Sequence, residues 1–339
     1  MNIKKIGLSA LAGSLAVVSA NAVELSVSGK TEVTYVSKDK GGVVGNPFGM
    51  GNSITFSGSG DVNGMTATYT AAIADQGQAN SNTSETFASS SLMLDMGDMG
   101  TIGFDQGVGE FGVSTIDDKT PYAYEEQWTY TGASNGLRAA GGTNVVGYKN
   151  TFSGYTLSIE VDPGHNATGS GSGDGTSTGA GTTDSGVNAA LSGSPMDGVS
   201  MGIGYGSEDA VNDTTAGDKD NQFTTGYITY AVGGATMGLQ RSSGTGGSVG
   251  TSSNEVTIYG ISYSINENLS VSYSEMDNDF GLGDNKNVTE PVTEGTKGFG
   301  ASYTLGSASV RALVSETDNV GGVRDTDVEH MEVSLMLAF

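Results

Sequence analysis

The sequence predicts an all-β protein, a transmembrane antiparallel β-barrel of about sixteen strands with short periplasmic turns and long external loops. Three observations support this prediction. Apolar and polar residues alternate in repeated pairs of segments, the connections between segments are short and long in turn, and an export signal precedes the first segment. Alternation at a period of two gives a strand one apolar and one polar face. Short turns at one end and long loops at the other are typical of transmembrane barrels.

The first 22 residues have the three parts of a secretory signal peptide. Lys4 and Lys5 form a short basic region, residues 6–18 form an uncharged and mostly apolar run, and the small residues Ala20 and Ala22 follow. This run is too short to span a bilayer as a helix. A buried amphipathic helix is the alternative, but the three parts occur in order and an alternating segment begins at once. We therefore expect residues 1–22 to be removed and residues 23–339 to form a single barrel domain.

Paired alternating segments fill most of the remaining chain. In one of the clearest pairs, every second residue is apolar on both sides of a turn at Gly306-Ser307. Gly and Asn at such short connections supply the positive φ angles of tight hairpins. We expect a first strand within residues 23–35, a last strand over residues 331–339, and paired segments over residues 54–73, 92–104, 146–161, 189–205, 228–239, 261–273 and 299–314. The total of about sixteen is even, as is usual for bacterial single-chain barrels.

The remaining connections are long, polar and rich in Gly, Ser, Thr, Asp and Asn. They span residues 38–51, 76–83, 107–143, 164–184, 210–219, 242–253, 280–293 and 320–324. A soluble β-sandwich would mix its loop lengths instead. A barrel of about sixteen strands is too wide for side chains to fill, so its interior should hold water. The sheet must also close, because an open edge in lipid would leave backbone groups without hydrogen bonds.

Composition excludes several classes of protein. The chain has no cysteine, so it contains no disulfide, thiol nucleophile or cysteine metal site. Its formal net charge of −24 would repel nucleic acid, whose phosphates are bound by clusters of Lys and Arg. A polar, acidic chain with 55 glycines could also be disordered, but the regular alternation argues against disorder.

Candidate catalytic and metal-binding groups are few. Of the two histidines, His165 lies in a Gly/Ser-rich loop and His330 on the polar face of the last strand. No catalytic constellation stands out, so we expect a protein that is not an enzyme and uses no cofactor. Asp209, Asp213, Asp218 and Asp220 lie close together in one loop, and residues 171–175 resemble a Gly/Asp calcium repeat, but neither has the ligand spacing of an EF-hand. Solvated loops are the favoured interpretation, and low-affinity Ca²⁺ binding in the external loops is the alternative.

The third long connection, residues 107–143, is the best functional candidate. It is far longer than ordinary connections, and such loops are usually functional or disordered. The loop holds Trp128, which is the single Trp of the chain, among several tyrosines. This density of aromatic residues indicates packing rather than disorder. A loop packed on the outside of the barrel is the alternative to one that folds into it.

The carboxyl end resembles the Gram-negative general porins. Met331, Val333, Leu335, Leu337 and Phe339 alternate with a polar face and end the chain on an aromatic residue. Together with the signal peptide, the strand number and the long third loop, this likeness covers the whole chain, although few single residues are diagnostic. The resemblance implies an integral protein of the outer membrane of a Gram-negative bacterium, a homotrimer in contact with lipid and lipopolysaccharide. It also implies that Phe339 is an assembly signal, that the third loop narrows the pore, and that small hydrophilic solutes and ions diffuse through it.

The charge pattern predicts the selectivity of such a channel. Alternation places the following side chains on the lumen wall: Glu24, Lys30, Glu32, Lys149, Glu160, Arg311, His330 and Glu332. The third loop contributes Asp117, Asp118, Lys119, Glu125, Glu126 and Arg138 to a candidate constriction. This wall lacks the arginine-rich cluster that general porins often carry. Acidic groups concentrate cations, so we expect a weak cation preference that declines as salt screens the lumen.

Two other functions remain open. A substrate-specific channel of the same fold would have a saturable site and a ladder of aromatic side chains along the lumen. A secreted acidic surface-layer or adhesion protein would have unpaired loop lengths and would not partition into detergent micelles as a heat-modifiable trimer.

Overall fold

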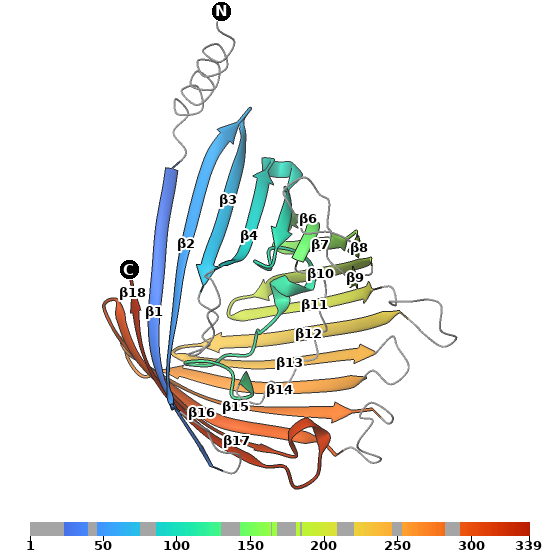
Figure 1. Cartoon of the computed structure of the whole chain (residues 1–339). Coiled ribbons are helices and arrows are strands. Elements are labelled where there is room, and N and C mark those ends of the chain that lie inside the picture. Colours follow the sequence, from blue (N-terminus) through green and yellow to red (C-terminus); the bar gives the residue numbers. More distant parts are fainter. Residues whose placement is uncertain are drawn as a thin grey trace, which may run out of the picture.

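The described strands close into one antiparallel barrel, in which β1 (Glu24–Asp39) pairs with both β2 (Phe48–Val62) and β18 (Val328–Ala338) (Figure 1). The computed structural model describes residues 24–39, 46–74, 86–129, 143–163, 165–167, 181–183, 185–208, 220–245, 253–281 and 292–339. The other barrel strands are β3 (Met65–Ala74), β4 (Thr86–Asp95), β5 (Thr101–Gln106), β6 (Thr143–Phe152), β7 (Tyr155–Asp162), β10 (Gly186–Met196), β11 (Val199–Glu208), β12 (Asn221–Val232), β13 (Ala235–Thr245), β14 (Asn254–Ser264), β15 (Leu269–Phe280), β16 (Glu294–Leu305) and β17 (Ala308–Asp318). Sixteen described strands therefore form the ring, which confirms the predicted fold class and strand number.

Some strands extend into segments that the sequence predicted as loops. β1 continues to Asp39 and β2 begins at Phe48, and β13 continues to Thr245. The apolar pattern fades at the ends of β1 and β13, where backbone pairing with the neighbouring strand continues without it, whereas Phe48 and Met50 continue the outward apolar row of β2. The expected loop 164–184 also contains a small separate sheet of β8 (His165–Ala167) and β9 (Gly181–Thr183). Near the expected loop 320–324, η4 (Val320–Gly322) forms a single 3₁₀ turn.

Short hairpins connect the strands at one end of the barrel. Between β2 and β3, Asn63 and Gly64 have φ angles of 55° and 83°. Positive φ at two successive residues is the requirement of a type I′ hairpin turn, whose twist matches that of the strands. The Asp61 carboxylate accepts a hydrogen bond from the Gly64 N–H at 3.1 Å and closes this turn. The Asn63-Gly64 pair in the sequence therefore predicts this tight hairpin.

Large apolar side chains cover the outer face of the barrel. On β14, Tyr259, Ile261 and Tyr263 are exposed, whereas Val256 and Ile258 point inward and are buried. The other strands repeat this arrangement, and Leu25, Tyr230, Tyr303 and Leu335 lie exposed on the same outer surface. A continuous apolar exterior is what a barrel needs in order to face lipid. No helix in the described part of the chain is long and apolar enough to cross a membrane.

The carboxyl terminus helps to close the ring. Phe339 and Gly29 exchange two backbone hydrogen bonds of 2.8 and 2.9 Å, and the Phe339 ring lies against Gly29. The ring is 74% exposed on the outside of the barrel. The role of Phe339 as an assembly signal stays a prediction. The expected signal peptide, residues 1–22, lies outside the described residues.

Candidate functional site

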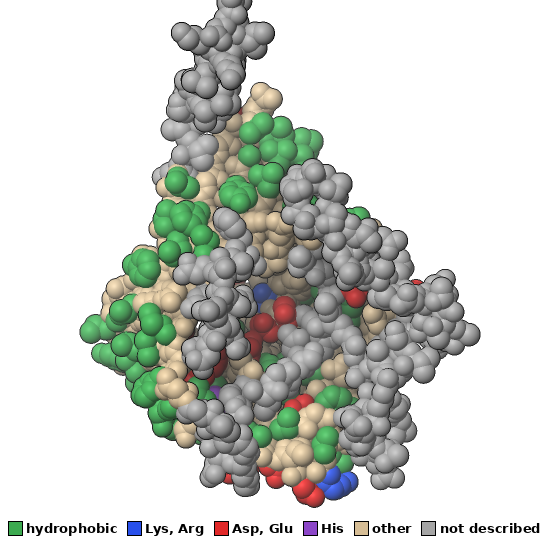
Figure 2. Space-filling model, in the orientation of Figure 1, with side chains coloured by type: hydrophobic (Ala, Val, Ile, Leu, Met, Phe, Trp, Pro, Cys, Tyr) green, Lys and Arg blue, Asp and Glu red, His purple; other side chains and the backbone are tan. Residues whose placement is uncertain are grey.

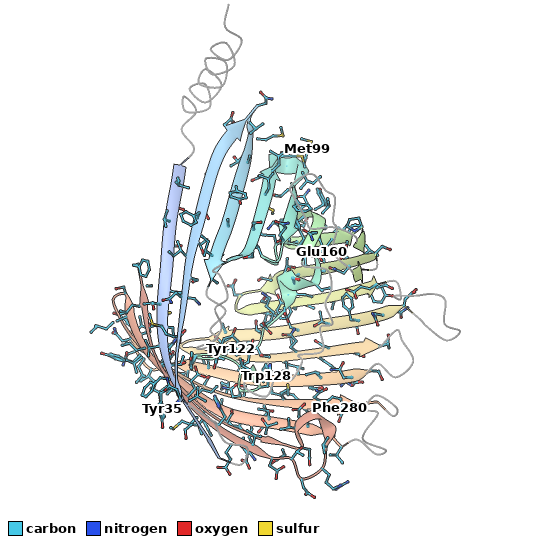
Figure 3. All side chains as sticks on the ribbon, viewed as in Figure 1. Tyr35, Met99, Tyr122, Trp128, Glu160 and Phe280 are labelled. Carbon is cyan, nitrogen blue, oxygen red and sulfur yellow. The ribbon has the colours of Figure 1, made fainter. Side chains whose placement is uncertain are left out.

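The candidate site is the lumen of the barrel together with residues 107–129, which we call the inner loop. These residues are the described part of the long connection that follows β5, and they run along the inside of the wall rather than over its rim (Figure 1). Tyr122 and Trp128 both lie within the barrel (Figure 3). A view into the barrel shows acidic and basic side chains in its hollow and hydrophobic ones on the outer wall (Figure 2).

The inner loop begins at an anchor on β6. Phe111 is fully buried, and its ring occupies the space over Gly147, where any side chain would collide with it. Lys149, two residues along β6, lies 5.5 Å from the centre of this ring, and its Nζ is 2.8 Å from Oε2 of Glu110. The Asp105 carboxylate accepts the backbone N–H groups of residues 108 and 110, at 2.7 and 2.6 Å. The start of the loop is thus fixed by packing and by charge-assisted hydrogen bonds.

A short 3₁₀ helix, η2 (Gly112–Ile116), continues along the wall. The Gly112 N–H donates to Oγ of Ser158 on β7, and the Val113 N–H donates to Oδ1 of Asn188 on β10, both at 2.8 Å. The Val113 side chain packs against the buried Phe223 of β12. Polar wall residues therefore satisfy the free N–H groups at the start of this turn.

The middle of the inner loop lies against β13 and β14. The Lys119 N–H donates to Oε1 of Gln240 at 2.8 Å, and Nε2 of Gln240 donates to the carbonyl oxygen of Ile116 at 3.3 Å. Pro121 lies so close to Gly238 and Gly260 that a Cβ atom on either glycine would meet it within 3 Å. Glycine within a strand often marks such a close approach of another backbone.

The loop next reaches the junction where the barrel closes. The Tyr124 hydroxyl hydrogen-bonds the Glu332 carboxylate of β18 and lies 3.2 Å from Oε1 of Glu32 on β1. Arg311 of β17 forms an ion pair with Glu32, and its guanidinium carbon lies 4.5 Å from the centre of the Tyr124 ring. The Ala123 N–H donates to Oγ of Ser272 at 2.9 Å. One tyrosine thus connects the inner loop to the first and last strands of the barrel.

The described loop ends on an apolar cluster inside the lumen. Trp128 is 4% exposed and packs with Val256, Ile258 and Met276, all of which point inward. The polar inner face that alternation predicts for nearly every strand is interrupted here. These side chains are apolar because the loop covers them and excludes water from this part of the wall.

Carboxylates lie close to one another on the inner loop. Burial, together with the charges of Glu332, Glu32 and Glu126, raises the pKa of Glu125 to about 7. Burial likewise raises the pKa of Glu126 to about 7, with added contributions from Asp118 and Asp117.

Two tyrosines lie among these acids. The pKa values of Tyr122 and Tyr124 are raised above the usual range, first by burial and then by the neighbouring carboxylates. Their hydroxyls therefore stay neutral donors at physiological pH. The charge of this part of the loop is set by its carboxylates.

The structure places most of the predicted site residues around the lumen. Asp117, Asp118, Lys119, Glu125 and Glu126 belong to the inner loop, while Arg138 lies outside the described residues. The wall residues that point inward are Lys30, Glu32, Lys149, Glu160, Arg311, His330 and Glu332. Glu24 opens β1, but its side chain is not among those described.

The structure brings some of these residues together and leaves others apart. Glu32, Arg311 and Glu332 meet around Tyr124, and Nε2 of His330 is 3.7 Å from the Glu332 carboxylate. Nδ2 of Asn188 donates to Oε1 of Glu160 at 3.1 Å, and Oδ1 of the same residue accepts the Val113 N–H of the inner loop.

The wall across the pore from the inner loop is uncharged over its central part. Inward positions on β2, β3 and β4 carry Ser53, Thr55, Ser57, Thr66, Thr68, Thr70, Ser89 and Ser91. No Lys, Arg or His is among these described inward positions. The central part of β2, β3 and β4 therefore presents hydroxyl groups to the lumen.

Several residues of the site were missed from the sequence. Glu110, Phe111 and Tyr124 were not singled out, although each fixes the inner loop to the wall. Glycines at inward strand positions are a sequence signal that could have shown where the loop lies. Those beneath the loop are Gly147, Gly238, Gly260, Gly298 and Gly300. Isolated glycines in otherwise good strands indicate close backbone approach.

The acidic segment of residues 210–219 and the Gly/Asp repeat of residues 171–175 lie outside the described residues, and only Asp220 of the aspartate group is described. Among the residues that are described, no three or more His, Asp or Glu side chains are grouped as metal ligands. Calcium binding by the external loops thus stays a prediction.

No protein-family model matches the sequence, and no curated protein sequence matches it. Solved structures of porins do match the fold. A Salmonella typhi OmpF in complex with daunomycin has a TM-score of 0.70 and 13% identity, over 94% of this chain and 99% of that one. A Rhodopseudomonas blastica porin variant has a TM-score of 0.59 and 14% identity, over 94% of this chain and 100% of that one. A porin refined at 1.8 Å has a TM-score of 0.62 and 13% identity, over 93% and 100% of the two chains. The chain therefore has the fold of the general porins.

Proposed function

We propose that this protein is a porin, a passive water-filled channel in the outer membrane of a Gram-negative bacterium that passes small hydrophilic solutes and ions and prefers cations. The observation that carries the proposal is an acidic loop held inside a closed barrel. Glu125 and Glu126 belong to this loop, while Arg311 and Lys149 on the wall are already paired with Glu32 and Glu110. Paired cations attract few anions, so the net field in the lumen favours cations.

The same proposal includes the location and assembly of the protein. The apolar exterior and the porin fold support a membrane-embedded barrel, and the porin fold supports a homotrimer in contact with lipopolysaccharide. Residues 1–22 would direct the chain across the inner membrane and would then be removed. We propose no catalytic activity and no cofactor.

Zero-current potential measurements on the purified protein in a planar bilayer test the proposed selectivity. Under a KCl gradient, we expect the sign of the potential to show that K⁺ crosses more readily than Cl⁻. The preference should weaken as salt is raised, because the Debye length falls from about 10 Å at 0.1 M to about 3 Å at 1 M. Liposomes that carry the protein should also swell in an uncharged sugar. An anion-selective potential, or liposomes that do not swell, would contradict the proposal.

Placing arginine on the outer face should destabilise the barrel far more than placing it on the inner face. Ile261 lies within the outward apolar run of β14, between Tyr259 and Tyr263, whereas Ser262 points into the lumen. An arginine on the lipid side costs about 2–4 kcal/mol near the middle of the bilayer. We therefore expect Ile261→Arg to lower the unfolding free energy by about that amount relative to Ser262→Arg. Urea unfolding in lipid vesicles gives both values, and equal losses would refute the membrane orientation.

A further inference from the structure

A cavity of about 760 Å³ lies inside the barrel, between the inner loop and the end with the short turns. Residues of β4, β5, β6 and β7 form its wall, together with the turn η1 (Gly97–Met99) that joins β4 to β5. Lys149 of β6 and Thr115 of the inner loop both line it, which places it in the lumen. A cavity of this volume is large enough for a small ligand.

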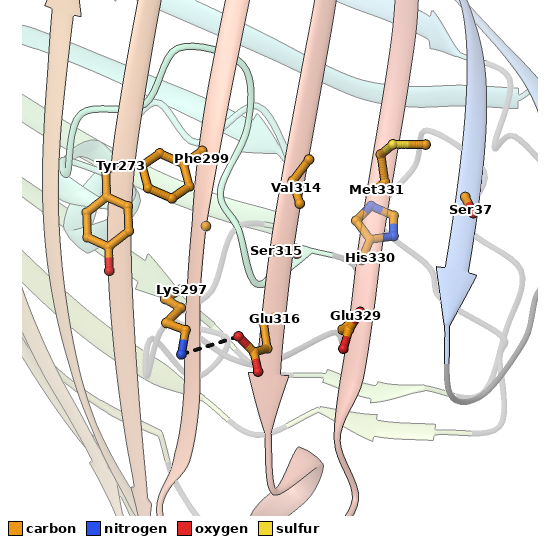
Figure 4. A pocket seen from close by; sticks show the side chains of 11 residues that line it. Ser37, Tyr273, Lys297, Phe299, Val314, Ser315, Glu316, Glu329, His330 and Met331 are labelled. Carbon is orange, nitrogen blue, oxygen red and sulfur yellow. Dashed lines mark ion pairs between the residues drawn. The ribbon is translucent and has the colours of Figure 1, made fainter.

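The outer face has a hollow of similar volume, about 730 Å³, but its lining is different (Figure 4). Tyr273, Phe299 and Val314 contribute aromatic and aliphatic side chains to this hollow, as expected where a barrel meets lipid. By contrast, every described side chain that lines the inner cavity is polar or charged. A polar solute from the water-filled lumen therefore fits the inner cavity better than the outer hollow.

Threonine hydroxyl groups line the inner cavity on β5, β6 and β7 and on the inner loop. In the hairpin of β6 and β7, the hydroxyl oxygens of Thr151 and Thr156 are 2.7 Å apart, and either group can donate to the other. The Thr115 hydroxyl donates to the carbonyl oxygen of Gly112 at 2.6 Å, so its oxygen can still accept a hydrogen bond. Because a hydroxyl group is both a donor and an acceptor, this lining matches a solute that has several hydroxyl groups of its own.

Charged groups lie along one row of the cavity wall. Asp95, Thr101 and Lys149 are successive register partners on β4, β5 and β6. Neighbouring strands lie about 4.8 Å apart, so roughly 10 Å separate the backbones of Asp95 and Lys149. The Lys149 ammonium is already paired with the Glu110 carboxylate at 2.8 Å, whereas Asp98 of η1 adds another carboxylate to the lining. The two aspartates, the lysine and its partner glutamate sum to −3 + 1 = −2, so the cavity favours a positively charged solute.

We infer that this cavity is a low-affinity binding site for small solutes that carry one ammonium group and several hydroxyl groups, as amino sugars do. The ammonium group lies towards Asp95 and Asp98, and the hydroxyl groups of the solute face Thr151 and Thr156. Binding is weak because the groups of the site stay in contact with water, and a weak site lets the solute leave again, as conduction requires. The inference rests on the proposed channel function and names a class of solute that the lumen favours.

The potassium current of the purified protein in a planar bilayer tests the hydroxyl part of the site. Glucosamine and cyclohexylammonium share the ring size and the ammonium group, but only glucosamine carries hydroxyl groups. At constant ionic strength, and at a pH where both amines are charged, glucosamine should reduce the current with a half-effect at about threefold lower concentration than cyclohexylammonium. Thr151→Val with Thr156→Val should remove this difference. The matched control, Thr304→Val with Ser309→Ala, should keep it, because these two hydroxyls form the same contact, at 2.8 Å, across the hairpin of β16 and β17 and do not line the cavity.

A second pair of substitutions tests the carboxylates. Asp95→Asn with Asp98→Asn should raise the half-effect concentration of glucosamine about fivefold and leave that of uncharged glucose unchanged. The amide oxygen of Asp95→Asn can still accept the Gly97 N–H, which Oδ1 of Asp95 accepts at 2.9 Å, so the turn keeps its hydrogen bond. Asp197→Asn is the matched control, since Asp197 lies in the short turn between β10 and β11 and does not line the cavity. This control should leave the glucosamine effect as it is.

Equal half-effects of glucosamine and cyclohexylammonium on the unmodified protein would overturn the inference. So would a glucosamine effect that survives the two aspartate substitutions, or controls that weaken it as much as the cavity variants do. Circular dichroism checks that each variant keeps its strand content. A protein without current, or with an anion-selective current, would contradict the proposed function itself. An intact cation-selective current on which the two amines act alike would contradict only the cavity assignment.

Discussion

Lowering the pH from about 8.5 to about 5.5 should remove most of the cation selectivity of the channel, because two carboxylates of the inner loop have a pKa of about 7. Burial and the neighbouring acids raise both values, so Glu125 and Glu126 are mostly neutral at the lower pH and mostly ionised at the higher one. Ordinary exposed glutamates, with a pKa near 4.3, would stay ionised over the whole range. A change centred near neutral pH therefore points to these buried groups.

The size of the effect follows from Coulomb's law. A unit charge about 7 Å from a passing ion in water contributes roughly 0.6 kcal/mol, which is about a threefold change in ion concentration. The charge acts on K⁺ and Cl⁻ with opposite sign, and salt near 0.1 M screens part of it. For two carboxylates we expect the permeability ratio of K⁺ to Cl⁻ to rise about fivefold between the two pH values. Mutual repulsion should spread the titration over a broad range.

Zero-current potentials measured at a series of pH values give this ratio. The Glu125→Gln, Glu126→Gln double variant should have a low ratio at every pH, since neither position can ionise. The matched control, Glu255→Gln on the outer face, should titrate like the unmodified protein. If the permeability ratio of the double variant still changes near pH 7, the two glutamates of the inner loop do not set the selectivity.

The same pKa shifts affect how firmly the loop is held. A carboxyl group whose pKa is raised in the docked loop opposes docking once it ionises. The docked loop is therefore most stable below about pH 4.5 and loses stability as the pH rises towards about 7. The loop should be more mobile at high pH, where the channel is also more selective.

Much of the fold could be predicted because the controlling signals are local. An apolar residue at every second position places Ile261 and Tyr263 on one face without knowledge of any distant contact. Asn63-Gly64 and similar pairs specify tight hairpins between strands that are adjacent in sequence. A chain of hairpins joined by alternately short and long connections then leaves few topologies other than a closed meander.

The candidate site could be predicted only in part, because it depends on distant contacts. Alternation assigns Glu32, Arg311 and Glu332 to the inner face one at a time. Their meeting around Tyr124 requires both closure of β1 on β18 and the path of the inner loop. The inward apolar residues Val256 and Met276 contradict the local pattern for the same reason, because Trp128 of the loop covers them.

Phe111→Ala at the first anchor should release the inner loop from the wall. Adding Gly147→Leu to this variant should partly restore docking of the loop. Phe111 is fully buried and its ring fills the space above Gly147. Phe111→Ala leaves a cavity that costs about 3–5 kcal/mol of docking free energy. Gly147→Leu instead places a side chain where the ring must lie. Gly147 is not among the glycines with positive φ, so a leucine is compatible with the strand backbone.

The readout uses the absence of cysteine in the natural chain. A Val113→Cys probe, buried at 1% exposure beside the anchor, should react slowly with a water-soluble thiol reagent. Either Phe111→Ala or Gly147→Leu should speed this reaction at least about tenfold, which corresponds to about 1.4 kcal/mol of docking free energy, and should increase current noise in open channels. The barrel strands should keep their stability, because the backbone hydrogen bonds between them do not depend on the inner loop.

The double variant distinguishes direct packing from general damage. Alanine at residue 111 makes room for leucine at residue 147, so the two changes together should disturb the loop less than the sum of the single effects, by about 1 kcal/mol or more. Thiol reaction rates and open-channel noise should then move back towards those of the unmodified protein. Gly51→Leu is the matched wall control, since no atom lies within 4 Å of the position of its Cβ. Strictly additive effects of the two anchor changes would mean that Phe111 does not hold the loop through its contact with Gly147, and that the polar contacts at Ser158, Asn188 and Gln240 fix the loop without it.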